Sequence, residues 1–446
     1  MNRIKILPLC AIFMALLSLV FNGYVVVYYD YWFSSHDASS FMAYLPAAVA
    51  VFLPLYFSEN LKNPSDFLCW TYYLMVTAPT TALVPQLGVP IDIVFKAGAI
   101  VILANAILAL AGKVKIVYVE NSMRLLTRKS FSVVVMLLGL VAMAVIFGSY
   151  KFNIDELLSF SIFVDTYEIR ANFRESGGQG LATYVLFWAA KVIFPAAIAY
   201  GLCFGKRTYV WLGLLCQLLV FSVSAHKSFV FSAALIFVVY FLLKRNISFR
   251  GWLGYASAFV GFSWCMFYFF SVTVLVDVFV RRAFIVPGIL SGWWVDYFSG
   301  KPHAFFAGGL LGNFFSKESQ TPAAFQIGDY YLGNMWTSAN VNFAVDAFGN
   351  AGPIAVVIAG AMVFVALTII NGAARLGPRE RVFFTCLSVP LFWTLIETSL
   401  VVAVVTHGLF ILLALALLWK GGSEKVLMNP LGSVRRVNGS YSDMHG

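Results

Sequence analysis

Charged side chains are scarce in this chain, and their scarcity excludes an ordinary soluble domain. Asp, Glu, Lys and Arg make up 11% of the 446 residues, whereas about a quarter of the residues of a soluble domain are charged. The six Cys residues show no C-x-x-C spacing, so neither a disulfide framework nor a metal site is expected. No P-loop, GxSxG, HExxH or dinucleotide-binding fingerprint occurs. The common soluble enzyme classes are therefore excluded.

Apolar residues, in contrast, make up 61% of the chain. They recur in runs of about 20 residues, each long enough to cross the hydrocarbon core as a helix, since backbone groups in lipid must be paired internally. We therefore expect an all-α polytopic bundle of about 12 transmembrane helices, forming a single membrane domain over residues 1–420, with a flexible cytoplasmic tail at 421–446. The expected spans are 8–29, 41–58, 67–86, 91–112, 131–150, 181–203, 208–224, 228–243, 252–276, 339–370, 382–398 and 400–419.

Most Lys and Arg residues lie in alternate gaps between these runs, and this pattern predicts the topology. Basic residues favour the cytoplasmic side, so both termini are expected there, in a bacterial inner membrane. Two outer gaps are long, 151–180 and 277–338, and both are predicted to be periplasmic loops. The second is rich in aromatic residues and interrupted by Gly and Pro, which predicts an amphipathic segment lying at the membrane interface.

Ten basic residues depart from this pattern. They lie within spans or in outer gaps, where an ionisable group is a functional candidate by default. A cation held there is suited to bind an anion, whereas the scattering of the basic residues over loops argues against nucleic acid. The ten are Lys96, Lys151, Arg170, Arg174, Lys191, Lys227, Arg281, Arg282, Lys301 and Lys317. Of these, Lys96 can pair with Asp92, one helical turn earlier.

The first long loop carries Arg170 and Arg174, four residues apart in DTYEIRANFRESGG. Either they belong to a solvated helix with local ion pairs, or they form an anion clamp, which the planar guanidinium suits. Lys191 stands mid-span with no acid at helical spacing. It either pairs with Asp346 or Glu397 from another helix or binds substrate.

Further candidates flank the outer ends of the spans. Lys227 follows His226 in a tight hairpin. Arg281 and Arg282 are adjacent and must point in different directions on a helix, so one can anchor the interface while the other faces inward. Asp346 follows Asn340 in SANVNFAVDAFGNAGP, where small residues would permit close approach of another helix or of an acceptor.

Together, cations, a few acids and many aromatic rings in a membrane suit a lipid-linked pyrophosphate that carries a sugar. Cations hold the phosphates, rings cover the sugar, and an acid or His accepts a hydroxyl proton. Asp346 is the favoured base. His303, in GKPHAFF, and His226 are the alternatives.

These segments resemble the Wzy-type O-antigen polymerases of bacterial inner membranes. The resemblance covers about 130–420 and rests on YEIR, HKS, RRAFIVPG, SANVNFAVDAFGNAGP and THGL. It implies a GT-C-like helical architecture and transfer of an undecaprenyl-pyrophosphate-linked glycan onto a second lipid-linked repeat unit at the periplasmic face. It also implies no cofactor or metal, and a separate chain-length co-polymerase as partner. The resemblance implies that Arg170 and Arg282 correspond to functional arginines of the family. Lys227 and Asp346 are the next residues to which it assigns a functional role. Within each pair, Arg174 or Arg281 remains an alternative match.

Two other functions fit the same pattern. An O-antigen ligase shares the lipid-linked donor and the topology, while a lipid-glycan flippase or transporter belongs to another class. Transporters often contain internal repeats, and this chain has no evident repeat. The polymerase is therefore preferred.

Overall fold

The computed structural model describes residues 3–30, 40–114, 125–159, 169, 173, 180–306 and 321–421, and these are helical almost throughout. Within them, nine helices are long and apolar enough to cross a membrane. The protein is thus an all-α, multi-pass membrane protein. The nine are Ile4–Tyr28, Pro64–Gln86, Ile91–Lys113, Arg128–Ser149, Leu181–Phe204, Arg207–Ser224, Lys227–Lys244, Phe249–Phe270 and Phe343–Ala374.

The first half of the chain contains several helices that change pitch along their length. Its elements are η1 (Arg3–Ile6), α1 (Leu7–Val20), η2 (Phe21–Val25), α2 (Val26–Tyr28), η4 (Phe41–Tyr44), α3 (Leu45–Phe52), η5 (Leu53–Tyr56), α4 (Pro64–Tyr72), η6 (Tyr73–Thr77), α5 (Ala78–Leu83), η7 (Val84–Gln86), α6 (Ile91–Lys113), β1 (Leu126–Thr127), α7 (Arg128–Ser149), α8 (Ile154–Leu158), α10 (Leu181–Trp188), η10 (Ala189–Ile193) and α11 (Phe194–Phe204).

The second half completes the bundle. Its elements are α12 (Arg207–Ser224), α13 (Lys227–Lys244), α14 (Phe249–Phe270), η11 (Leu275–Ile285), α15 (Val286–Gly300), α17 (Ala323–Leu332), α18 (Phe343–Ala374), α19 (Pro378–Glu397), α20 (Leu400–Val405), α21 (Leu409–Leu418) and β2 (Trp419–Gly421). The short strands β1 and β2 pair in parallel and tie the start of α7 to the end of α21.

The three other expected spans, 41–58, 382–398 and 400–419, are helical but are not among the nine long apolar helices. Residues 41–56 form a shorter helix, and the first turn of α19 carries Arg379, Glu380 and Arg381. The last expected span is divided into α20 and α21, because Gly408 adopts a left-handed conformation with φ of 82°. Two expected boundaries also shift: α14 ends at Phe270, and α18 begins at Phe343 and bends at Ala351 and Gly352 before Pro353.

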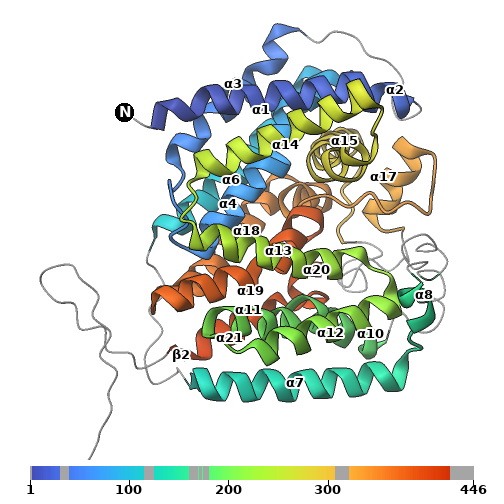
Figure 1. Cartoon of the computed structure of the whole chain (residues 1–446). Coiled ribbons are helices and arrows are strands. Elements are labelled where there is room, and N and C mark those ends of the chain that lie inside the picture. The colour runs from blue at the N-terminus through green and yellow to red at the C-terminus, as the bar shows by residue number, and fades with distance from the viewer. Residues whose placement is uncertain are drawn as a thin grey trace, which may run out of the picture.

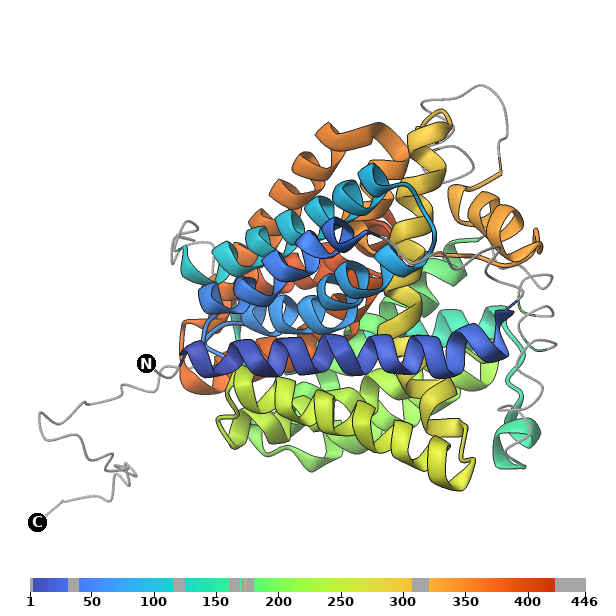
Figure 2. The same cartoon turned by 90° about the horizontal axis from the view of Figure 1, so that it is seen from above.

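The prediction of an interfacial segment across the second long loop is wrong for residues 275–300. There η11 and α15 form a helix whose aromatic residues, including Trp293 and Trp294, are buried. The Gly residues serve close packing: a Cβ on Gly288 would lie 2.8 Å from the backbone of Pro79 in α5. Helix α15 is seen end-on in Figure 1 and lengthwise in Figure 2, so it crosses α1 at a steep angle.

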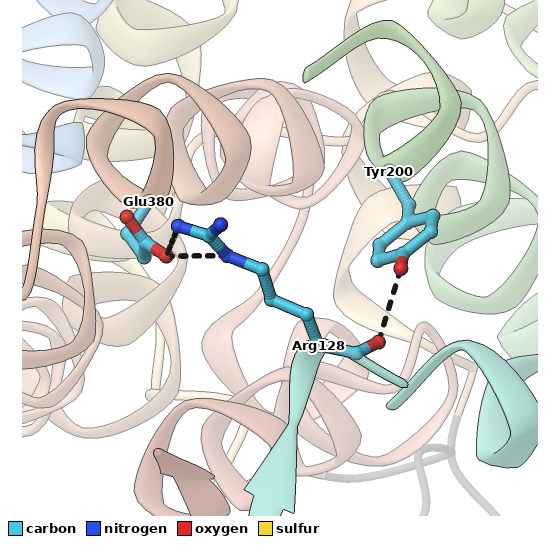
Figure 3. Close-up of polar contacts among 3 residues, drawn as sticks. All are labelled: Arg128, Tyr200 and Glu380. Atoms are coloured by element: carbon cyan, nitrogen blue, oxygen red, sulfur yellow. Dashed lines mark hydrogen bonds and ion pairs between the residues drawn. The ribbon is translucent and has the colours of Figure 1, made fainter. Parts of the chain in front are cut away.

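The bundle has two distinct ends. Elements η1, β2 and the start of α7 lie at one end, while α8 and α17 lie at the other (Figures 1 and 2). At the first end, Arg128 donates hydrogen bonds from Nε (3.2 Å) and Nη2 (2.8 Å) to Glu380 Oε1. The hydroxyl of Tyr200 donates to the carbonyl of Arg128, as Figure 3 shows. This network joins α7, α11 and α19, which gives Arg128 a structural partner.

Candidate functional site

A cavity of about 380 Å³ opens where α15, the segment between α17 and α18, and the end of α19 meet. It contains charged groups of both signs, polar side chains and an aromatic ring within an otherwise apolar bundle. Its lining residues are Arg281, Arg282, Val286, Pro287, Ile289, Leu290, Trp293, Leu332, Thr337, Ser338, Ala339, Asn340, Val341, Ile396 and Glu397. Three residues predicted from the sequence, Arg281, Arg282 and Asn340, are therefore brought together here.

The two adjacent arginines have different surroundings. Arg281 donates from Nε to Asp277 Oδ1 at 2.7 Å, and its guanidinium carbon lies 4.3 Å from the ring centre of Tyr29. Its side chain is only 8% exposed. Arg282 is exposed and lines the cavity, and it forms no ion pair within the described part of the chain. Consecutive helical residues point about 100° apart, so neutralising Arg281 leaves Arg282 as the cation available to a ligand.

Asp277 and Tyr29 complete the support of Arg281. The hydroxyl of Tyr29 donates to Asp277 Oδ1. Burial opposes ionisation of Asp277, but hydrogen bonds from Arg281 and Tyr29 outweigh it and hold the pKa of this carboxyl below its usual value. Burial and the hydrogen bond to Asp277 raise the pKa of Tyr29 to about 12. The start of η11 is therefore fixed to the end of the first span.

Other parts of the cavity lining are polar and aromatic. The hydroxyl of Ser338 donates to Asn340 Oδ1 at 3.0 Å. Trp293 stacks on Tyr331 of α17, with ring centres 5.0 Å apart and planes 6° apart. Tyr331 in turn donates to Asp296 at 2.6 Å, and burial together with this bond raises the pKa of its phenol. These contacts fix a flat aromatic surface beside Arg282.

Lys191 lies behind the cavity in the π-helical turn η10 and is 4% exposed. Gln217 donates to the carbonyl of Ala190 at 2.9 Å, which satisfies a backbone group within the widened turn. The ammonium of Lys191 lies 5.8 Å from the ring centre of Phe229 and interacts electrostatically with Glu397. Of the two tertiary partners that the sequence suggests for Lys191, the one it interacts with is Glu397.

Two histidines extend this buried group. The ring centre of His407 lies 5.0 Å from that of Phe187, and the ring of His226 lies 5.5 Å from the same Phe. His407 interacts electrostatically with His226 and with Lys191. Lys227, the first residue of α13, is half-buried and does not line the cavity.

Asp346, in the first turn of α18, and His303, beside the bend of α18 at Gly352, both lie outside the cavity lining. Asn350 donates from its side chain to Asp346 Oδ2 at 3.1 Å and accepts from the backbone N–H of Phe306 at 2.8 Å. The His303 ring fills the space beside Gly352, which has a φ of 74°.

The small-residue surface near Asp346 is therefore already occupied. A Cβ on Gly349 would lie 2.7 Å from the Trp294 ring, and one on Gly352 would lie 3.0 Å from His303 Nε2. Of the two partners that these small residues would admit, another helix or an acceptor, the structure places a helix there, because Trp294 of α15 packs on Gly349.

Arg170 and Arg174 fall outside the described residues, as does much of the first long loop. Two described residues of that loop, Ile169 and Phe173, are buried. Ile169 packs with Phe221 and Ala225, and the ring centre of Phe173 lies 6.2 Å from that of His226. Ile169 and Phe173 thus pack on the hairpin between α12 and α13.

Sequence reasoning missed Asp277, although it lies four residues before Arg281, a spacing that indicates an ion pair. It named Glu397 as a possible partner of Lys191 but did not predict that Glu397 lines the cavity. The described residues contain no group of three or more His, Cys, Asp or Glu side chains able to hold a metal. No family model, curated protein or solved structure matches the chain.

Proposed function

We propose that this protein is a Wzy-type glycosyltransferase that polymerises undecaprenyl-pyrophosphate-linked oligosaccharide repeat units of O-antigen or a related polysaccharide. The observation that carries the proposal is the cavity in which exposed Arg282 stands beside Asn340 and Trp293. A guanidinium binds two phosphate oxygens through a planar fork, and aromatic and amide groups suit sugar rings. The cavity therefore offers both kinds of contact that a glycosyl pyrophosphate needs.

Glycosyl transfer from a lipid-linked donor requires stabilisation of the pyrophosphate leaving group. When the anomeric C–O bond breaks, negative charge grows on the pyrophosphate, and a cation already held in place lowers the energy of that state. Arg282 is suited to this role, and the ion pair between Arg281 and Asp277 fixes the helix that carries it. Arg170, Arg174 and Lys227 remain proposed contacts for the donor from the hairpin side.

The proposed setting is the bacterial inner membrane, with η1 and β2 at the cytoplasmic end and α8 and α17 at the periplasmic end. The basic gaps of the sequence support this orientation through the positive-inside rule. A twelve-span, GT-C-like architecture, lipid-linked donor and acceptor as partners, and a separate co-polymerase all belong to the same proposal.

A deletion strain tests the function. If the chain is the polymerase, surface lipopolysaccharide cores will carry a single repeat unit, and the gene supplied in trans will restore long chains. Cores without any repeat would instead indicate the ligase. Repeat units retained on the cytoplasmic face would indicate the flippase. Unchanged long chains in the deletion strain would refute all three functions.

A further inference from the structure

Glu397 is the carboxylate that faces the cavity. Among the described lining residues it is the one acid, and it shares that lining with Arg281 and Arg282. Its side chain is exposed to the cavity although it lies inside the bundle. Asp346, in contrast, is outside the lining and accepts a hydrogen bond from Asn350.

The backbone holds Glu397 firmly in this position. It is the last residue of α19, and Thr398, which follows, is extended with φ of −155°. Ser399 then caps α20 by accepting a hydrogen bond from the backbone N–H of Val402 at 3.1 Å. With a helix on either side, the carboxylate has a defined location, as a group that handles a proton needs.

Two positively charged side chains flank the carboxylate. Lys191 interacts with it electrostatically from the buried side. Arg282 lies on the cavity side. A carboxylate away from bulk water needs such partners to stay charged. The arrangement therefore presents an anion to the cavity without joining it to Arg282.

We propose that Glu397 is the general base of glycosyl transfer and that Lys191 is a positioning residue that holds its charge. The inference rests on the proposed function. The acceptor hydroxyl gives its proton to a carboxylate oxygen of Glu397 while its oxygen forms the bond to the anomeric carbon. The bond from that carbon to the pyrophosphate breaks, and its electron pair remains on the phosphate oxygen facing Arg282. The products are the lengthened glycan and undecaprenyl pyrophosphate.

The first test compares isosteric variants of three acids in the complemented deletion strain, with polymer normalised to the amount of protein. A positioned base contributes about 10²–10⁴-fold to a rate, so Glu397→Gln should reduce polymer at least 100-fold. Glu59→Gln, an exposed acid on another pocket, should leave polymer unchanged. Loss of polymer with Asp346→Asn and not with Glu397→Gln would transfer the role to Asp346 and overturn the proposal.

The second test separates a base from a partner that only neutralises Lys191. The double variant Lys191→Met/Glu397→Gln removes both charges and so avoids leaving a buried ammonium alone. If Glu397 is the base, the double variant accumulates normally yet makes no polymer. Recovery of polymer in the double variant would refute the base role. Normal polymer in the deletion strain would refute the proposed function itself, whereas normal polymer with Glu397→Gln alone would refute only the inference.

Discussion

Replacing Asp277 with Asn should destabilise the protein, because it removes the negative charge that pairs with the buried guanidinium of Arg281. Removing one partner of a fully buried ion pair costs about 3–5 kcal/mol. In this pair Arg281 is 8% exposed but Asp277 is 28% exposed, and Asn can still accept a hydrogen bond from the guanidinium. We therefore expect a loss of about 1–3 kcal/mol in the free energy of unfolding.

The chain supplies a matched control for this variant. Asp92 and Lys96 form a pair with the same four-residue spacing at 3.0 Å, as the sequence predicts, but their side chains are 61% and 47% exposed. Asp92→Asn should leave the free energy of unfolding nearly unchanged, because the pair is exposed to solvent. Unfolding in mixed micelles with increasing SDS measures both. Equal, small losses for the two variants would refute the view that Asp277 holds a buried cation in place.

Three further predictions concern pH, the cavity and topology. The folded-state pKa of Asp277 is lowered, so its contribution should be complete above its unfolded pKa of about 3.9 and disappear as pH falls through the lower folded value. The difference in unfolding free energy between wild type and Asp277→Asn should shrink in that acid range, and a constant difference would contradict this assignment. Arg282→Lys keeps the charge but loses the planar fork, so polymer per molecule should fall about 10- to 100-fold at normal accumulation, and unchanged polymer would remove Arg282 from the site. Reporter fusions after Gly180 and Thr321 should report the periplasm, and a cytoplasmic signal at either would reverse the topology.

The sequence predicted most of the membrane-crossing helices because a long apolar run has few alternatives in lipid. It failed where tertiary packing decided the structure. Pro287 and Gly288 suggested a break in the chain, yet Pro287 lies within the continuous helix formed by η11 and α15, two residues after the π-helical stretch ends at Ile285. Gly288 and Gly292 let α15 approach Pro79 and Val84. The local sequence around a glycine does not show which distant helix will pack against it.

The site could be predicted in part for a similar reason. A basic residue on the unexpected side of a membrane is visible in sequence, and Arg281, Arg282 and Asn340 do line one cavity. Which arginine remains available to a ligand depended on Asp277 and on Tyr29, which is distant in sequence. The sequence offered Asp346 and Glu397 as partners of Lys191, and the choice of Glu397 depended on the packing of α19 against η10.

Polymerisation by the purified protein tests the central claim most directly. Lipid-linked repeat units, extracted from the deletion strain, would be added to proteoliposomes that contain wild-type protein or Arg282→Ala. The wild type should produce glycans of two or more repeat units and release undecaprenyl pyrophosphate, while Arg282→Ala should produce neither. Equal polymer from the two proteins would show that the cavity is not the site. The wild-type protein used here must also restore long chains in the deletion strain. If that protein makes no polymer in proteoliposomes, the claim that it catalyses the transfer without another protein is contradicted.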